Sequence, residues 1–237
     1  MKILFTSGKG GVGKSTLASA FAKILAARGE GVLLVDFDIA LRTLDLMLGL
    51  GDRVLYDWND VLMDRCDPLS AVVPNPGGPE LLAAPLARTT VTPEQVRTLI
   101  QNYEPYYDYI ILDSPAGIGQ GFEAAVSPAD AAFVVSTPDK VCVRSAAVAA
   151  ECLEEHGVPA RLIINRFSRR SLEKGGRLNI DDVIDSTGLQ LIGVVPEDPS
   201  LTEAALTGGP VDQRRRGAKA ILRIQQRMSG ESVPLRL

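Results

Sequence analysis

Eight consecutive residues near the start of the chain, GKGGVGKS at positions 8–15, follow the pattern G-x-x-x-x-G-K-S/T. A strand-like apolar stretch over residues 2–7 precedes them, and a helix-like run over residues 15–28 follows. In such a strand–loop–helix unit, the glycines let successive backbone N–H groups point at phosphate oxygens, and the helix start adds its positive dipole end. The pattern therefore predicts a phosphate-binding loop. A glycine-rich turn without a ligand is the alternative.

The pattern also suggests what each residue of the loop does. We expect Lys14 to bind the β- and γ-phosphates, Ser15 to hold Mg²⁺ and Thr16 to hydrogen-bond the α-phosphate. The backbone around the phosphates would come from the preceding residues, which are Gly8, Lys9, Gly10, Gly11, Val12 and Gly13. A phosphate loop needs only one lysine, so the residues alone leave open whether Lys9 has a function or is a solvated loop charge.

The rest of the chain alternates short apolar runs with longer helix-like stretches. Strands are expected over residues 31–38, 80–85, 107–117, 131–138, 160–166 and 189–198, and helices over residues 92–103, 141–156 and 213–228. Apolar, β-branched strands joined by helical crossovers are typical of a parallel sheet that helices cover on both faces. We therefore predict a single α/β domain over residues 1–237, a three-layer sandwich with a mostly parallel sheet. The turn-rich residues 73–80 are interpreted as a surface loop.

Three aspartates stand at the ends of predicted strands. Asp36 and Asp38 end the strand over residues 31–38, and Asp113 follows four apolar residues of another strand. Ligands of open parallel sheets bind at the carboxyl ends of the strands, so these side chains should meet the phosphates. We expect Asp113 to hold the Mg²⁺ of Ser15 through water and Asp36 to share these water-mediated contacts, and we expect Asp38 to orient or deprotonate the attacking water. For a single strand-end aspartate, a turn or helix cap is the alternative.

Composition and charge exclude several classes of protein. The net charge of −4 argues against a protein that coats nucleic acid, and no specific nucleic-acid binding is expected. The cysteines, Cys66, Cys142 and Cys152, form neither a CxxC pair nor a Cys/His cluster, so neither a disulfide framework nor a zinc site is predicted. The sequence shows no signal peptide and no run of about 20 apolar residues, which favours a cytoplasmic location.

The stretch KGGVGKST at residues 9–16 resembles the deviant Walker A motif of the MinD/ParA group of P-loop ATPases. The resemblance continues through VDFDIALRTLDLMLGL, DYIILDSPAGI, INR and LIGVVPEDPSL, and so covers nearly the whole chain. It implies a homodimer that forms face to face on ATP and hydrolyses ATP slowly. Lys9 would then reach the phosphates of the other subunit, where a cation stabilises the charge that develops on the transferred phosphoryl group.

The resemblance also implies where the base of ATP or ADP would bind. Asn165 and Arg166 match the position that reads the edge of the adenine, and Pro196, Glu197 and Asp198 match the loop that lies along the base. Ordinary turn chemistry is the alternative for these residues. Residues 38–45 and 117–121 would be the two switch loops. The cellular role that the resemblance implies is placement of the division septum.

Two segments depart from the MinD branch of the group, which the stretches DFDIALRTLDL and DSPAGI resemble most. That branch ends in an amphipathic, membrane-inserting helix, whereas residues 228–237 read MSGESVPLRL. We expect the anchor to be absent or truncated, with peripheral membrane association only if a longer C-terminus or a partner supplies it. After Arg144, where the branch carries acidic residues for a division-regulator partner, this chain has Ser145, Ala146 and Ala147, which weakens the case for that partner.

Other functions stay open at this point. One is a ParA-type or flagellar-number regulator with another cargo. A second is a reductase or metal-insertion relative, which would need cysteines at the dimer interface that the sequence does not indicate. A third is a scaffold that binds the nucleotide without hydrolysing it.

Overall fold

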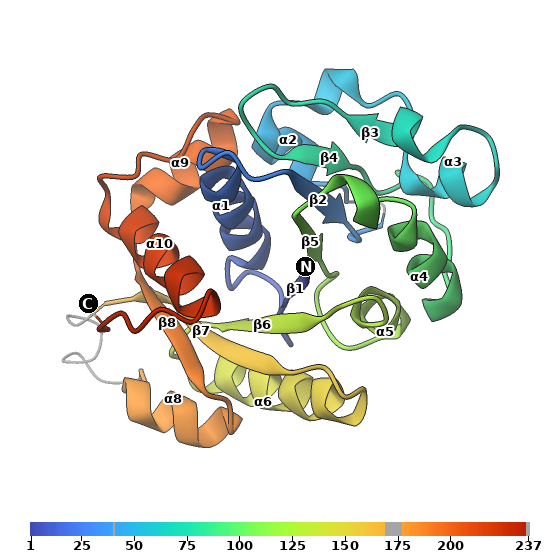
Figure 1. Ribbon diagram of the computed structural model, residues 1–237. Coiled ribbons are helices and arrows are strands. Elements are labelled where there is room, and N and C mark those ends of the chain that lie inside the picture. Colours follow the sequence, from blue (N-terminus) through green and yellow to red (C-terminus); the bar gives the residue numbers. More distant parts are fainter. Residues whose placement is uncertain (40, 169–176, 236–237) are drawn as a thin grey trace.

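The computed structural model describes residues 1–39, 41–168 and 177–235 (Figure 1). Within them, eight strands form one sheet in the order β3-β4-β2-β5-β1-β6-β7-β8. The strands are β1 (Lys2–Thr6), β2 (Val32–Asp36), β3 (Val72–Val73), β4 (Glu80–Leu82), β5 (Tyr109–Asp113), β6 (Ala131–Ser136), β7 (Ala160–Phe167) and β8 (Leu191–Pro196). Only the pair β3–β4 is antiparallel among the described strands. The predicted α/β fold with a mostly parallel sheet is confirmed.

Helices pack on both faces of this sheet (Figure 1). Apolar residues of α1, α2, α9 and α10 form one core with the sheet, and those of α3, α4, α5 and α6 form another. The α-helices described are α1 (Lys14–Ala26), α2 (Leu44–Leu48), α3 (Trp58–Leu62), α4 (Pro93–Gln101), α5 (Gln120–Val126), α6 (Lys140–Glu155), α8 (Ile180–Thr187), α9 (Pro199–Thr207) and α10 (Arg216–Met228).

The inner residues of the central strands are apolar because helices cover both faces of the sheet. In β1, Ile3 and Phe5 belong to the core beneath α1, whereas Leu4 belongs to the core on the opposite face. The ring of Phe5 lies 5.5 Å from that of Phe21 in α1 and 5.3 Å from that of Phe133 in β6. Each such buried side chain stabilises the fold by roughly 1.5–3 kcal/mol. The core therefore fixes α1, and with it the phosphate loop, against the centre of the sheet.

Some element boundaries differ from the sequence-based expectations. The helix α4 begins as predicted at Thr92, whose side chain forms a capping box with Gln95. The predicted surface loop over residues 73–80 connects two short antiparallel strands, β3 and β4, because the chain reverses there. The helices α2, α3, α5, α8 and α9 were not predicted, since short helices present too few periodic positions to be recognised. None of the helices in the described residues is both long and apolar enough to cross a bilayer.

Candidate active site

The loop from Gly8 to Gly13 connects the end of β1 to the start of α1, and the backbone geometry requires glycine at two of its positions. A Cβ atom on Gly8 would lie 1.9 Å from the backbone oxygen of Ser145 in α6. Gly13 adopts a left-handed conformation with φ of 90°, and a Cβ there would lie 2.5 Å from Nδ2 of Asn165. These contacts explain why the loop can approach its neighbours so closely only with glycine at both positions.

Lys14, the first residue of α1, points into the site at the carboxyl ends of β1 and β5. Its Nζ lies 2.7 Å from Oδ1 of Asp113 and 3.1 Å from Oγ of Ser15. The lysine side chain is 8% exposed and that of Asp113 is fully buried. The structure thus brings together three residues that the sequence analysis assigned to the phosphates and Mg²⁺.

Asp36 and Asp113 lie side by side because β2 and β5 pair in register at these two residues. Burial, together with the neighbouring charge of Asp113, raises the pKa of Asp36 to about 7. One carboxylate oxygen of Asp36 accepts the N–H of Asp38 at 2.8 Å. The other accepts the N–H groups of Thr43 and Leu44, both at 3.1 Å. Asp36 therefore fixes the loop after β2 and the first turn of α2 in addition to any role at a metal.

Asp38 lies in the same electrostatic environment. Its carboxylate is half-buried, and burial raises its pKa; the charge of Lys14 opposes this shift and that of Asp113 adds to it. A carboxylate with a raised pKa close to the phosphate lysine is suited to hold or accept a proton of water. The structure thus places Asp36, Asp38 and Asp113 together at one edge of the sheet.

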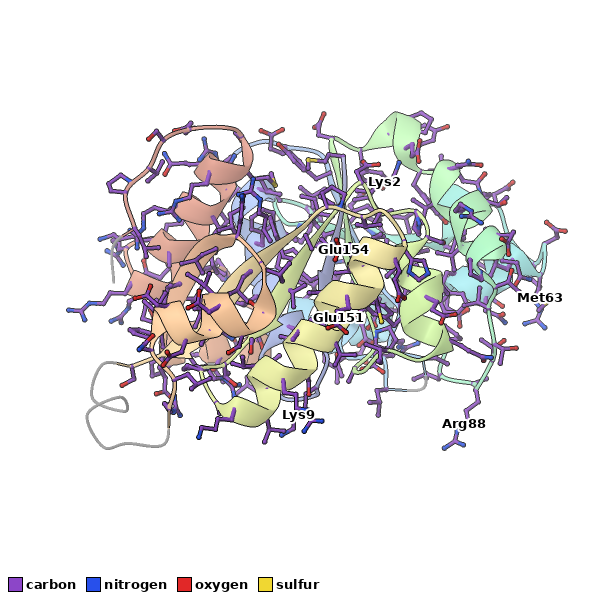
Figure 2. The ribbon with its side chains drawn as sticks, turned by 90° about the horizontal axis from the view of Figure 1, so that it is seen from below. Lys2, Lys9, Met63, Arg88, Glu151 and Glu154 are labelled. Atoms are coloured by element: carbon purple, nitrogen blue, oxygen red, sulfur yellow. The ribbon has the colours of Figure 1, made fainter. Side chains whose placement is uncertain are left out.

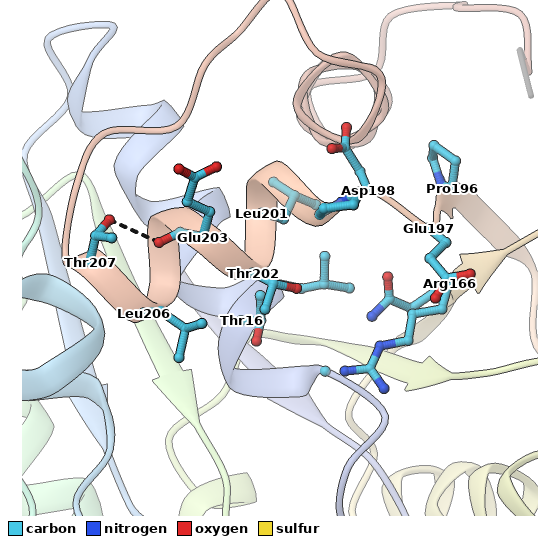
Figure 3. A pocket seen from close by; sticks show the side chains of 14 residues that line it. Thr16, Arg166, Pro196, Glu197, Asp198, Leu201, Thr202, Glu203, Leu206 and Thr207 are labelled. Carbon is cyan, nitrogen blue, oxygen red and sulfur yellow. Dashed lines mark hydrogen bonds between the residues drawn. The ribbon is translucent and has the colours of Figure 1, made fainter.

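A pocket of about 550 Å³ opens next to the phosphate loop (Figure 3). It is lined by residues of both predicted base-binding segments, by Gly13 and Thr16 at the phosphate end, and by α9. Thr202 and Leu206 lie on the side of α9 that faces Thr16, and the carboxylate of Glu203 points away from it (Figure 3). The sequence analysis missed the contribution of α9. Its signals were the sequence DPS at the start, with Asp198 as the N-cap, and Gly208 at the end.

The predicted base-binding side chains are already engaged by the protein. Nδ2 of Asn165 donates to the backbone oxygen of Val12 at 2.8 Å, and Nη1 of Arg166 donates to that of Gly11 at 3.0 Å. Both side chains thereby hold the phosphate loop. The carboxylate of Asp198 accepts the N–H of Ser200 and the N–H of Gly217, so it fixes the starts of α9 and α10. Pro196 and Glu197 line the pocket between these groups.

Comparison with known proteins agrees with this geometry. Residues 3–211 match the family described as "CobQ/CobB/MinD/ParA nucleotide binding domain". The chain belongs to this family. The septum site-determining protein MinD of Bacillus subtilis is 39% identical to this ATPase, covering 99% of this chain and 91% of that protein.

Solved structures of relatives have the same architecture. The MinC:MinD cell division protein complex of Aquifex aeolicus aligns with a TM-score of 0.91 at 37% identity, covering 100% of this chain and 98% of the other. MinD of Pyrococcus horikoshii, solved in complex with Mg-ADP, aligns with a TM-score of 0.83 at 26% identity, covering 96% and 95% of the two chains. This chain is thus a P-loop ATPase.

The residues of this ATPase fit a bound Mg²⁺. Oδ2 of Asp113 is buried and has no hydrogen-bond partner, although an ionised oxygen without a partner is costly in a protein interior. Ser15 and Asp36 are the other two predicted metal residues, and both lie at this end of the sheet. The described part of the chain contains no cluster of three His, Cys, Asp or Glu arranged around a metal. Mg²⁺ takes few protein ligands and several from phosphate and water, so the two carboxylates and the hydroxyl at this end of the sheet fit that ion.

Lys9 belongs to the phosphate loop and lies exposed at the rim of the site, and Figure 2 shows it beside the first turns of α6. Lys9 is exposed, and its ammonium has no ion pair among the described residues. On α6, Arg144 is exposed, Ala146 is buried, and no acidic residue occupies the three positions after the arginine. Acidic side chains appear further along the helix, at the exposed Glu151 and Glu154 (Figure 2).

Proposed function

We propose that this ATPase is a MinD-like molecular switch that acts in placing the division septum. ATP and Mg²⁺ join two copies into a face-to-face homodimer, slow hydrolysis to ADP separates them, and residues 1–237 form the single domain that carries out the cycle. Full-length similarity to proteins named septum site-determining protein MinD supports the cellular role.

The observation that carries the proposal is the position of Lys9. The loop already supplies a buried phosphate lysine in Lys14, whereas the second lysine lies exposed at the rim, without an ion pair among the described residues. A long cationic side chain at the rim of a phosphate site is suited to reach the phosphates of a second copy that faces it. There it would stabilise the charge on the transferred phosphoryl group, so that hydrolysis would depend on dimerisation.

The remaining chemistry follows from the positions of the other side chains. Lys14 binds the β- and γ-phosphates, and Thr16 bonds the α-phosphate at the mouth of the base pocket. Asp38 orients the attacking water or accepts its proton. Ser15, Asp36 and Asp113 would hold Mg²⁺, which would supply positive charge against the β- and γ-phosphates.

The base of the nucleotide occupies the pocket beside α9. Asn165 and Arg166 are proposed to read its edge, and Pro196, Glu197 and Asp198 lie along it. The carboxylate of Asp198 already accepts hydrogen bonds from the starts of α9 and α10, so only the backbone of Asp198 is proposed to contact the base. Asn165 keeps its amide oxygen for the base while its amide nitrogen holds the loop.

Location and partners follow the same model. We propose that the protein acts in the cytoplasm. The cell division protein MinC occurs in complex with MinD of Aquifex aeolicus. A protein of that kind is a candidate partner here. It would contact an α6 face that carries Glu151 and Glu154 in place of acidic residues directly after Arg144.

A regulator with a different cargo is the second candidate function. A ParA family ATPase from Chlorobium tepidum aligns over 93% of this chain with a TM-score of 0.77, but at only 26% identity. The higher identity to proteins named MinD favours septum placement. Depletion of the protein in its own host separates the two functions, because misplaced septa are expected only for the first.

Two measurements test the switch. With Mg²⁺ and a non-hydrolysable ATP analogue, the mass measured by light scattering should be twice that of the 25.3 kDa chain, and a mass that stays monomeric at saturating analogue would refute the dimer.

The second measurement is phosphate release. It should be lost in Lys9→Ala, although this variant should still bind ATP. Asp38→Ala should dimerise on ATP without turnover. Turnover equal to wild type in Lys9→Ala would exclude the role in trans, and Lys140→Ala serves as the control for an exposed lysine near the same rim.

A further inference from the structure

Lys23 is a buried lysine in the last turn of α1 that the ATPase chemistry described above does not use. Only 9% of the residue is exposed, and burial lowers the pKa of its ammonium to about 8. Its Nζ donates three hydrogen bonds, to the backbone oxygens of Met47 at 2.9 Å, Ala204 at 3.1 Å and Gly209 at 2.8 Å. A buried ammonium has three protons to place, and here each has a carbonyl acceptor.

The three acceptors belong to the ends of two different helices. Met47 lies in the last turn of α2, Ala204 lies in the last turn of α9, and Gly209 follows α9. The last carbonyls of a helix have no partner within the helix and carry the negative end of its dipole. A cation shared between two such ends stabilises both and ties them to α1, the helix that begins with Lys14.

The two helix ends also touch each other directly. Gly49 follows α2 and Gly208 follows α9, and both adopt the left-handed conformation. A Cβ on Gly208 would lie 2.5 Å from the backbone nitrogen of Gly49. The absence of side chains at both glycines lets the helix ends pack back to back beneath the ammonium of Lys23. A displacement of α9 would therefore be transmitted to α2 through rigid contacts.

The opposite end of α2 reaches the catalytic carboxylates. Asp36 accepts the N–H groups of Thr43 and Leu44 at the start of the helix, and its other oxygen accepts the N–H of Asp38. The start of α2 is thus held by a buried carboxyl group and its end by a buried lysine. The other contact partner of Lys23, α9, forms a wall of the base pocket through Thr202 and Leu206.

We propose that Lys23 is a positioning residue that couples occupancy of the base pocket to the loop that carries Asp38. A base that packs against α9 holds that helix in place, Lys23 and the paired glycines hold α2 against it, and α2 holds the loop through Asp36. The inference rests on the proposed placement of the base beside α9. It predicts that a ligand with a base orders this loop more than a ligand that offers phosphates alone.

Hydrogen exchange with two ligands tests the coupling. The probes are a non-hydrolysable ATP analogue and inorganic tripolyphosphate, each saturating and each with Mg²⁺. In the wild type, both should slow exchange at residues 8–16. The analogue should slow exchange at residues 41–50 roughly tenfold more than tripolyphosphate does, a size typical of coupling between sites. In K23M, the protection at residues 8–16 should persist, and the difference at residues 41–50 should disappear.

The controls separate coupling from general damage. K23R keeps a cation and hydrogen-bond donors and should retain most of the difference, and K219M removes an exposed lysine from α10 and should leave it unchanged. K23Q replaces K23M if the latter does not fold. Three results would each overturn the coupling. K23M or K23Q could keep the full difference in protection between the two ligands at residues 41–50, K23R could lose as much of it as K23M, or the wild type could show no difference. No protection at residues 8–16 in the wild type would instead overturn the proposed nucleotide site.

Discussion

Substitution of Asn165 by alanine tests whether this side chain holds the phosphate loop before any nucleotide binds. Asn165 is 6% exposed, and its amide nitrogen donates a buried hydrogen bond to the backbone oxygen of Val12 at 2.8 Å. Asn165→Ala removes the donor and leaves the carbonyl of Val12 buried without it. Leaving a buried acceptor unsatisfied costs about 1–3 kcal/mol.

The expected loss of about 2 kcal/mol corresponds to a fall in melting temperature of roughly 4–8 °C for a chain of this size. Urea unfolding of the protein without nucleotide and without Mg²⁺ gives the free energy directly. Asn102→Ala is the matched control, because Asn102 is exposed at the end of α4, and surface substitutions change the free energy of unfolding by about 0.5 kcal/mol or less. If both variants unfold with the same free energy, Asn165 acts on the base alone and the reasoning from the Val12 contact is refuted.

Two further substitutions test the buried charges and the paired helix ends. Lys14→Met should abolish ATP binding and destabilise the protein by about 3 kcal/mol, because it leaves the buried carboxylate of Asp113 without its cation. Adding Asp113→Asn to this variant should restore most of the stability measured by urea unfolding, but it should not restore ATP binding. Gly208→Ala should destabilise the protein by at least about 2 kcal/mol more than Gly29→Ala in the same assay. Both glycines have a positive φ, which costs alanine about 1–2 kcal/mol at either position, but an added Cβ meets backbone atoms only at Gly208. Equal losses of stability would contradict the back-to-back contact.

The parts of the site that the sequence predicted are those that depend on local pattern. The phosphate loop needs a fixed spacing of glycines and one lysine between a strand and a helix, and the carboxylates need only to end neighbouring parallel strands. Both conditions can be checked along the chain. The register that places Asp36 beside Asp113 was not predicted as such, but it follows once β2 and β5 are neighbours.

The parts that the sequence did not predict depend on contacts between distant segments. The five residues of α2 give no periodic pattern, and Lys23 stands in an apolar run where nothing marks its three acceptors. Asn165 was assigned to the base from a resemblance, whereas its contact with Val12 joins segments far apart in the sequence. Such interactions are decided by the folded arrangement of carbonyl groups, which no spacing of residue types shows.

The two buried lysines of α1 explain why this helix is central to the enzyme. Lys14 and Lys23 lie about 13 Å apart along it at 1.5 Å per residue. The first holds Asp113 at the phosphate end, and the second holds the ends of α2 and α9. A charge buried at either position is stable only while its partners stay in place. In the proposed complex, the phosphates would act on the first turn of this helix and the base, through α9, on its last turn, to which the loop with Asp38 is attached through Asp36 and α2. We therefore expect the ordering of that loop to depend on the whole nucleotide, and the difference between the ATP analogue and tripolyphosphate measures how strongly.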